Sequence, residues 1–214
     1  LQARRLLRAH RPDVVLGMGG YAAFPGGLMA RLAGIPLVVH EQNAVAGAAN
    51  RWLGRFARAA AVPFEGTGLP RATVTGMPLR REIATLDRAA HREQARAHFG
   101  LTDAPTVLVT GGSLGAQRLN DAFAGAAAGL SAQGVQVLHV AGTGKDFVPQ
   151  GATGAPYVVL AYCDRMDLAY AAADLVVARS GANTVCELTA VGLPALYVPL
   201  PIGNGEQRLN AAAV

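Results

Sequence analysis

Short apolar runs alternate along the chain with stretches in which apolar residues recur every three or four positions. The runs have the length and β-branched content of buried strands, and the stretches between them have the period of amphipathic helices. The pattern predicts strands at 13–17, 36–40, 72–75, 106–110, 135–140, 157–160, 174–178 and 195–198, and helices at 1–10, 25–33, 47–57, 88–99 and from 205 onward. Strands alternating with helices form parallel sheets, so we predict a doubly wound α/β fold.

The alternation of strand-like and helix-like stretches is interrupted once, by Pro78 and by a highly charged stretch from Arg80 to Arg96. A glycine-rich loop that directly follows a strand stands on either side of this interruption, at 17–21 and at 111–115. Bare backbone N–H groups at the start of a helix can hold a phosphate group. We therefore expect two Rossmann-like domains that face a cleft, comprising residues 1–80 and 81–214.

Composition narrows the class of protein. Hydrophobic residues make up 51% of the 214 positions, enough for a sizeable core, and no apolar run approaches the ~20 residues that span a bilayer. Cys163 and Cys186 lack metal-ligand spacing, so we expect reduced thiols in a cytoplasmic protein. Residues 1–60 hold eight arginines against two acidic residues, whereas the remainder holds eleven basic and twelve acidic residues. This asymmetry predicts an anionic partner for the first domain, the alternative being solvated helix faces.

Two common nucleotide motifs do not fit. The loop 111–115 departs from GxGxxG at Ser113, and the next strand ends without the acidic residue that would hold an NAD ribose, which argues against a dinucleotide oxidoreductase. The segment 142–145 ends on Lys145, but Asp146 replaces the hydroxyl residue of a Walker loop, so we interpret it as a turn. The sequence contains no Ser/His/Asp set, and its histidines have no metal-ligand spacing.

Polar clusters follow two of the predicted strands. The stretch 40–43, His-Glu-Gln-Asn, stands at the carboxyl end of a strand, where parallel sheets place their chemistry; the alternative is a polar turn. After the strand 174–178, Ser180 is the predicted N-cap of a helix whose N-terminus suits an anion. Glu187 within that helix can accept both hydroxyls of a ribose, the alternative being a solvated helix residue.

In their order, these motifs resemble those of one family, the N-acetylglucosaminyltransferases of peptidoglycan synthesis. The resemblance covers nearly the whole chain and rests on residues 13–21, 40–43, 111–113, 179–182, and Gln207 with Asn210. It implies a GT-B fold that binds the acceptor in the first domain and the donor in the second. It further implies an inverting hexosyl transfer from UDP-GlcNAc to a polyprenyl-pyrophosphate-linked MurNAc-pentapeptide, at the cytoplasmic face of the bacterial membrane, with no cofactor, metal or nucleic acid.

The resemblance also implies roles for individual residues. The donor contacts carried over by position are Asn43, Arg80, Ser113, Cys163, Ala182, Asn183, Thr184, Val185, Cys186, Glu187 and Gln207. Arg80 and Ser113 would face the pyrophosphate, the backbone at Cys163 the uracil, Glu187 the ribose and Gln207 the GlcNAc. The candidates for the acceptor pyrophosphate are Gly19, Gly20 and Tyr21, and the catalytic candidates are His40 and Glu41.

The family's N-terminal glycine loop would precede Leu1 and its last helices would follow Val214, so we expect the chain to be a fragment that is inactive alone. Two alternatives stay open: a related transferase with another lipid acceptor, and a non-catalytic nucleotide-sugar-binding module. Within the predicted helix 47–57, Arg51 and Arg55 recur at helical spacing, with Arg58 three positions on and Trp52 and Phe56 beside them. This mixture predicts binding to anionic inner-leaflet lipid, unless the aromatic rings pack into the core.

Overall fold

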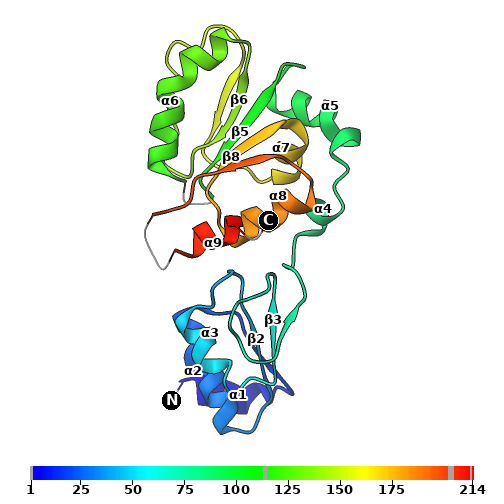
Figure 1. Ribbon diagram of the computed structural model, residues 1–214, viewed down its shortest axis with the longest axis vertical. Helices are drawn as coiled ribbons and strands as arrows, with labels where there is room; N and C mark the ends of the chain where they lie inside the picture. The colour runs from blue at the N-terminus through cyan, green and yellow to red at the C-terminus, as the bar shows by residue number, and fades with distance from the viewer. Residues whose placement is uncertain (1, 113–114, 202–204, 213) are drawn as a thin grey trace. The chain divides into compact units, whose positions relative to one another are not determined.

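The computed structural model describes residues 2–112, 115–201, 205–212 and 214 (Figure 1). Its contacts divide the chain into two compact units, and the boundary lies between Pro78 and Leu79. We expected every residue after 80 to belong to the second domain. The contacts instead assign helix α9 (Glu206–Ala212) to the first unit.

The first unit contains a four-stranded parallel sheet in the order β1-β2-β3-β4. Its strands are β1 (Val15–Gly17), β2 (Leu37–His40), β3 (Ala59–Val62) and β4 (Ala72–Val74). The helices α1 (Gln2–His10), α2 (Gly20–Leu32) and α3 (Ala48–Leu53) connect or precede them. Leu37 and Val39 of β2 pack on one face of the sheet against Leu53 of α3 and Phe24 of α2, which forms the core of this unit.

Three elements of the first unit differ from the sequence-based prediction. Strand β3 was not predicted, because three of its four residues are alanine, which is depleted in strands. Helix α2 begins at Gly20 rather than near Pro25, and the proline lies inside the helix. Helix α3 ends at Leu53, so the segment 54–57 does not continue the predicted helix.

The second unit contains a five-stranded parallel sheet in the order β7-β6-β5-β8-β9. Its strands are β5 (Thr106–Thr110), β6 (Gln136–Val140), β7 (Tyr157–Leu160), β8 (Leu175–Ala178) and β9 (Ala195–Tyr197). The chain proceeds from β5 in one direction and then returns to β8 on the other side, so the sheet is doubly wound as predicted. Ligands of such sheets bind beyond the carboxyl ends of the strands at this switch point, here between β5 and β8.

Helices cover both faces of the second sheet. Helix α6 (Gln117–Ala132) packs on one face, and the helices α4 (Arg81–Ala84), α5 (Arg88–Phe99), α7 (Met166–Ala172) and α8 (Ala182–Ala190) contribute to the core on the other. The loop after β5 requires glycine at two positions. A Cβ atom on Gly111 would lie 2.2 Å from the backbone nitrogen of Ala116, and one on Gly115 would lie 2.0 Å from the carbonyl oxygen of Ala141.

Candidate substrate-binding sites

Glu41 organises the polar loop that follows β2. Its side chain is buried, and both of its carboxylate oxygens accept hydrogen bonds. Oε1 accepts from the backbone N–H groups of Gln42 and Asn43, both at 3.0 Å, and from the Asn43 amide at 3.3 Å. Oε2 accepts from the backbone N–H of Gly47 at 2.9 Å and from the Asn50 amide at 3.0 Å. Five N–H donors therefore hold one carboxylate and fix the path of the loop into α3.

His40 precedes this loop and differs from Glu41 in its hydrogen bonding. The residue is only 6% exposed, yet neither ring nitrogen has a hydrogen-bond partner among the described residues. Its carbonyl oxygen accepts from Nδ2 of Asn50 at 2.9 Å. Among the two catalytic candidates, His40 is the one whose side chain is not committed to holding the backbone.

Asn50 connects three parts of the first site, and it was not predicted from the sequence. Its amide binds both the carbonyl of His40 and the carboxylate of Glu41, and a Cβ on Gly19 would lie 3.1 Å from its Nδ2. Gly19 and Gly20 have positive φ angles of 83° and 73°, and α2 begins at Gly20. Tyr21, the third pyrophosphate candidate, is 96% exposed. A signal was available, because Asn50 stands at helical spacing between the apolar residues Ala46 and Leu53.

Helix α9 binds the same loop through Asn210. The backbone N–H of Ala44 donates to Oδ1 of Asn210 at 2.8 Å, and Nδ2 of Asn210 donates to Oδ1 of Asn43 at 3.2 Å. Asn210 is fully buried. Asn43 and Gln207, which we predicted as donor contacts, are thus both in the first unit, whereas the other described donor candidates lie in the second.

Glu187 is the centre of the second site. It lies in α8 and is 7% exposed, which excludes the alternative of a solvated helix residue. Oε2 accepts from the hydroxyl of Tyr170 at 2.7 Å, and Oε1 lies 3.7 Å from a guanidinium nitrogen of the half-exposed Arg80. The structure therefore brings Arg80 and Glu187 together from segments more than a hundred residues apart. Tyr170 was not predicted, because nothing in its alanine-rich helix distinguishes it from an ordinary core residue.

The two thiols lie near the two members of this pair, Cys163 near Arg80 and Cys186 near Glu187. Burial raises the pKa of the Cys163 thiol, with Arg80 among the charges that act on it. Burial also raises the pKa of the Cys186 thiol, and the Glu187 carboxylate adds to the shift. Both cysteines are free, in agreement with the expectation of reduced thiols.

The start of α8 differs in detail from the prediction. The N-cap is Gly181 rather than Ser180. Ala182 and Val185 are buried in the core, whereas Asn183 is exposed and Thr184 and Cys186 are half-buried. The side chain of Val185 is therefore unavailable to a ligand, and contact at this position is limited to the backbone. Ser113 lies outside the described residues.

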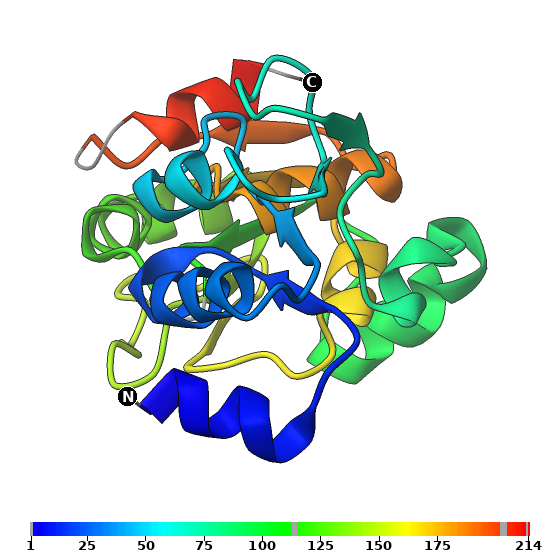
Figure 2. The same cartoon turned by 90° about the horizontal axis from the view of Figure 1, so that it is seen from below.

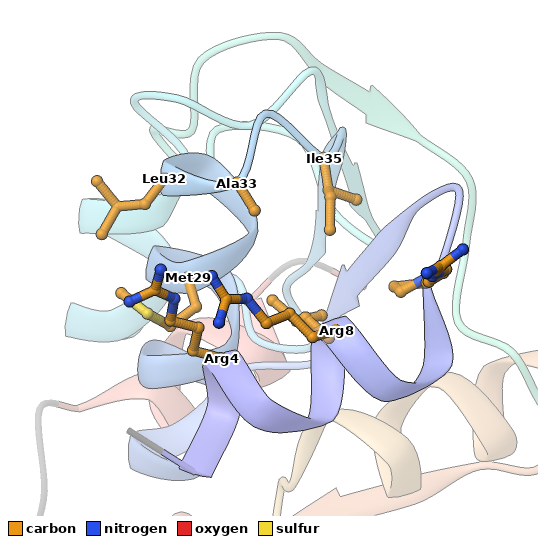
Figure 3. A pocket seen from close by; sticks show the side chains of 9 residues that line it. Arg4, Arg8, Met29, Leu32, Ala33 and Ile35 are labelled. Atoms are coloured by element: carbon orange, nitrogen blue, oxygen red, sulfur yellow. The ribbon is translucent and has the colours of Figure 1, made fainter.

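A basic hollow lies between α1 and α2, which run side by side at the surface of the first unit (Figure 2). The hollow has a volume of about 620 Å³. Arg4 and Arg8 extend from α1 beside Met29, Leu32 and Ala33 (Figure 3). Leu32 is 70% exposed, so arginine and apolar side chains share one surface.

A second hollow continues this basic surface. It has a volume of about 530 Å³, and its lining includes Arg31, Arg55 and Arg58. We expected Arg51, Arg55 and Arg58 to share one helix face. This expectation was wrong, because α3 ends at Leu53 and both Arg55 and Arg58 lie beyond it. The ring of Trp52 packs at a tilt against Phe24 and edge to face against Phe56, at 4.9 and 4.7 Å between ring centroids, and it remains partly exposed.

The described residues provide neither a cluster of metal ligands nor a membrane-spanning helix. No group of three or more His, Cys, Asp or Glu side chains in this part of the chain is placed to hold a metal ion. None of the helices described is both long and apolar enough to cross a bilayer.

The sequence matches two family models. Residues 1–62 match the glycosyltransferase family 28 N-terminal domain, and residues 106–214 match the glycosyltransferase family 28 C-terminal domain. A protein of Nocardioides sp. is 61% identical over 95% of this chain, and one of Acidothermus cellulolyticus is 56% identical over the whole of it. Both are named UDP-N-acetylglucosamine–N-acetylmuramyl-(pentapeptide) pyrophosphoryl-undecaprenol N-acetylglucosamine transferase. The chain spans 57% and 60% of their lengths.

Solved structures give the same assignment of fold. The crystal structure of Acinetobacter baumannii MurG superposes with a TM-score of 0.78 at 36% identity, over 99% of this chain and 59% of that chain. A UDP-GlcNAc 2-epimerase from Neisseria meningitidis superposes with a TM-score of 0.64 at 16% identity, over 96% of this chain and 64% of that chain, a likeness of fold alone. The predicted GT-B fold is thereby confirmed.

Proposed function

Since this chain belongs to glycosyltransferase family 28, we propose that the protein is an inverting hexosyltransferase of peptidoglycan synthesis. It moves GlcNAc from UDP-GlcNAc to the 4-hydroxyl of a MurNAc-pentapeptide carried on undecaprenyl pyrophosphate. The names of relatives 56–61% identical to the chain support both substrates. The observation that carries the donor half is the buried Glu187 carboxylate beside Arg80, in the helix that follows β8 at the switch point of the second sheet.

The chemistry of this pair fits a uridine diphosphate. A buried carboxylate is a strong acceptor for the two vicinal hydroxyls of a ribose, and a half-exposed guanidinium suits a pyrophosphate. The N-terminus of α8 adds unpaired backbone N–H groups. Inverting transfer is a single displacement at the anomeric carbon, in which charge develops on the departing UDP. Arg80 and these N–H groups would stabilise that charge.

The two catalytic candidates divide into different roles. Both Glu41 oxygens are occupied by N–H donors, so we propose that Glu41 holds the acceptor loop in place. His40 has two ring nitrogens without described partners, which supports a role in proton transfer from the acceptor hydroxyl. Asn43, which is held by Glu41 and by Asn210, would present its amide to the sugar.

The first unit would bring the protein to its acceptor. A polyprenyl-linked acceptor is confined to the membrane, and the inner leaflet carries anionic lipid. The arginine-lined hollows beside exposed Leu32 and the partly exposed Trp52 support peripheral attachment to that leaflet. This surface also supports a lipid partner over a nucleic acid, because apolar side chains are interleaved with the arginines.

Calorimetry on the protein expressed from its complete open reading frame tests the donor half. UDP and UDP-GlcNAc should bind, and NAD and ATP should not. Equal or tighter binding of NAD would refute the proposal. Binding of UDP-GlcNAc without transfer to any lipid acceptor would favour a nucleotide-sugar-binding module, and transfer to a different lipid would favour a related transferase.

A further inference from the structure

We propose that Tyr170 is a positioning residue that aims the Glu187 carboxylate at the ribose, and thereby sets the preference for a ribonucleotide donor. The inference rests on the proposed function, in which Glu187 accepts the ribose hydroxyls. Tyr170 itself does not contact the nucleotide. It acts through the 2.7 Å hydrogen bond from its hydroxyl to Oε2 of Glu187.

The geometry divides the carboxylate into a held oxygen and an available one. Tyr170 is 2% exposed and is among the largest fully buried side chains of the described residues, so its ring is enclosed by the packed core. The hydroxyl at the end of that ring fixes Oε2 on the interior side. Oε1 is left toward the half-exposed Arg80, 3.7 Å away, which is the side from which a ligand can approach.

The Tyr170 hydroxyl acts as a hydrogen-bond donor in this position. Burial, reinforced by the Glu187 charge, raises the pKa of the Tyr170 hydroxyl far above its ordinary value. The phenol is therefore protonated near neutral pH, and among the described residues its proton is donated to Oε2 of Glu187. A glutamate side chain has three rotatable bonds, and a fixed donor at one oxygen removes most of that freedom before the ligand arrives.

The consequence concerns selectivity as well as affinity. Oε1 has two lone pairs, so when the carboxylate is held at a fixed angle this oxygen can accept from the 2′- and 3′-hydroxyls together, whereas a mobile carboxylate loses part of this paired contact. The wild-type protein should therefore prefer UDP over 2′-deoxy-UDP by about tenfold or more, the value of a hydrogen bond to a charged group. Without the Tyr170 hydroxyl this ratio should shrink.

The test compares Tyr170→Phe with the wild type, both expressed from the complete open reading frame. Phenylalanine keeps the ring and removes only the hydroxyl. UDP should bind about five- to thirtyfold more weakly, while 2′-deoxy-UDP should be affected much less. The ratio of the two dissociation constants is measured on one sample, so it does not depend on how much of the variant is folded. In the Glu187→Gln background, Tyr170→Phe should cause little further loss.

Tyr157→Phe is the matched control. Tyr157 is also a largely buried tyrosine of the second unit, and its hydroxyl bonds to the buried His139 at 2.9 Å. Its loss should lower stability and leave the UDP to 2′-deoxy-UDP ratio unchanged. If Glu187→Gln weakens UDP but Tyr170→Phe leaves the ratio at its wild-type value, the positioning role is refuted and the proposed function stands. If the wild type binds no UDP, the proposed function fails and the inference fails with it.

Discussion

Replacing Glu41 with Gln distinguishes between two roles for this residue, a carboxylate that holds the loop in place and a catalytic base. Glutamine retains one oxygen, which can still accept the three N–H groups that meet Oε1. Its amide nitrogen would take the place of Oε2, where it faces the N–H of Gly47 and the amide of Asn50. Two charge-assisted hydrogen bonds are lost, each worth at least about 1.5 kcal/mol, so the loop should lose about 3 kcal/mol. This loss corresponds to a roughly hundredfold increase in the equilibrium constant for local opening of the loop.

Hydrogen exchange of peptides that cover residues 41–50 measures this opening directly. In Glu41→Gln, their amides should exchange up to about a hundredfold faster, and transferase activity should fall together with this protection. Glu65→Gln is the control, because Glu65 is an exposed carboxylate of the same unit. If the variant keeps full protection and yet loses all activity, Glu41 acts as a catalytic base and our interpretation of its hydrogen bonds is wrong.

Three further predictions follow from buried and basic groups. Burial lowers the pKa of His139 to about 4, so the folded state holds this ring neutral while the unfolded chain takes up a proton below about pH 6.5; stability should fall by about 3 kcal/mol as the pH drops from 6.5 to 4. His139→Gln should flatten this slope in acid unfolding curves, and an unchanged slope would exclude His139 as its source. Both thiols should be alkylated slowly because burial raises their pKa values, and saturating UDP should slow them further; equal rates with and without UDP would remove Cys163 from the donor site. Changing Arg4, Arg8 and Arg11 to Gln should weaken binding to anionic vesicles at least tenfold at low salt, whereas changing the exposed Arg81 and Arg118 should not; equal binding by both variants would leave the hollow without a membrane role.

The second sheet was predictable because most of its strands are short apolar runs rich in β-branched residues, although β6 also contains Gln136 and His139. The run 106–110 has the bounds of β5, and the charged helix predicted at 88–99 has the bounds of α5. Strand β3 was not predicted because its alanines are not β-branched. It forms a strand because it pairs with both β2 and β4. The sequence pattern indicates a buried strand only where the residues of the strand themselves favour it. Where pairing with adjacent strands determines the strand, the pattern does not indicate it.

The sequence predicted where the candidate site residues lie along the chain, but it did not predict which side chains they contact. Strand ends and glycine loops located the stretch 40–43 and Glu187 from sequence alone. The hydroxyl of Tyr170 and the return of α9 to the first unit depend on contacts between elements that are separate in the sequence. The five donors on Glu41 lie within nine residues of it, and they converge only because of the conformation of the loop. Such contacts leave no periodic pattern in the sequence, whereas Asn50 stands at helical spacing from the apolar Leu53.

Transfer of radiolabelled GlcNAc tests the central claim most directly. The protein expressed from its complete open reading frame would be incubated with UDP-[14C]GlcNAc and a polyprenyl-pyrophosphate-linked MurNAc-pentapeptide, beside its Glu187→Gln variant. We predict label in the lipid-linked product for the wild type, and a large rise in KM for UDP-GlcNAc in the variant. Wild-type protein that leaves all label on the nucleotide, or a variant with an unchanged KM, would contradict the account.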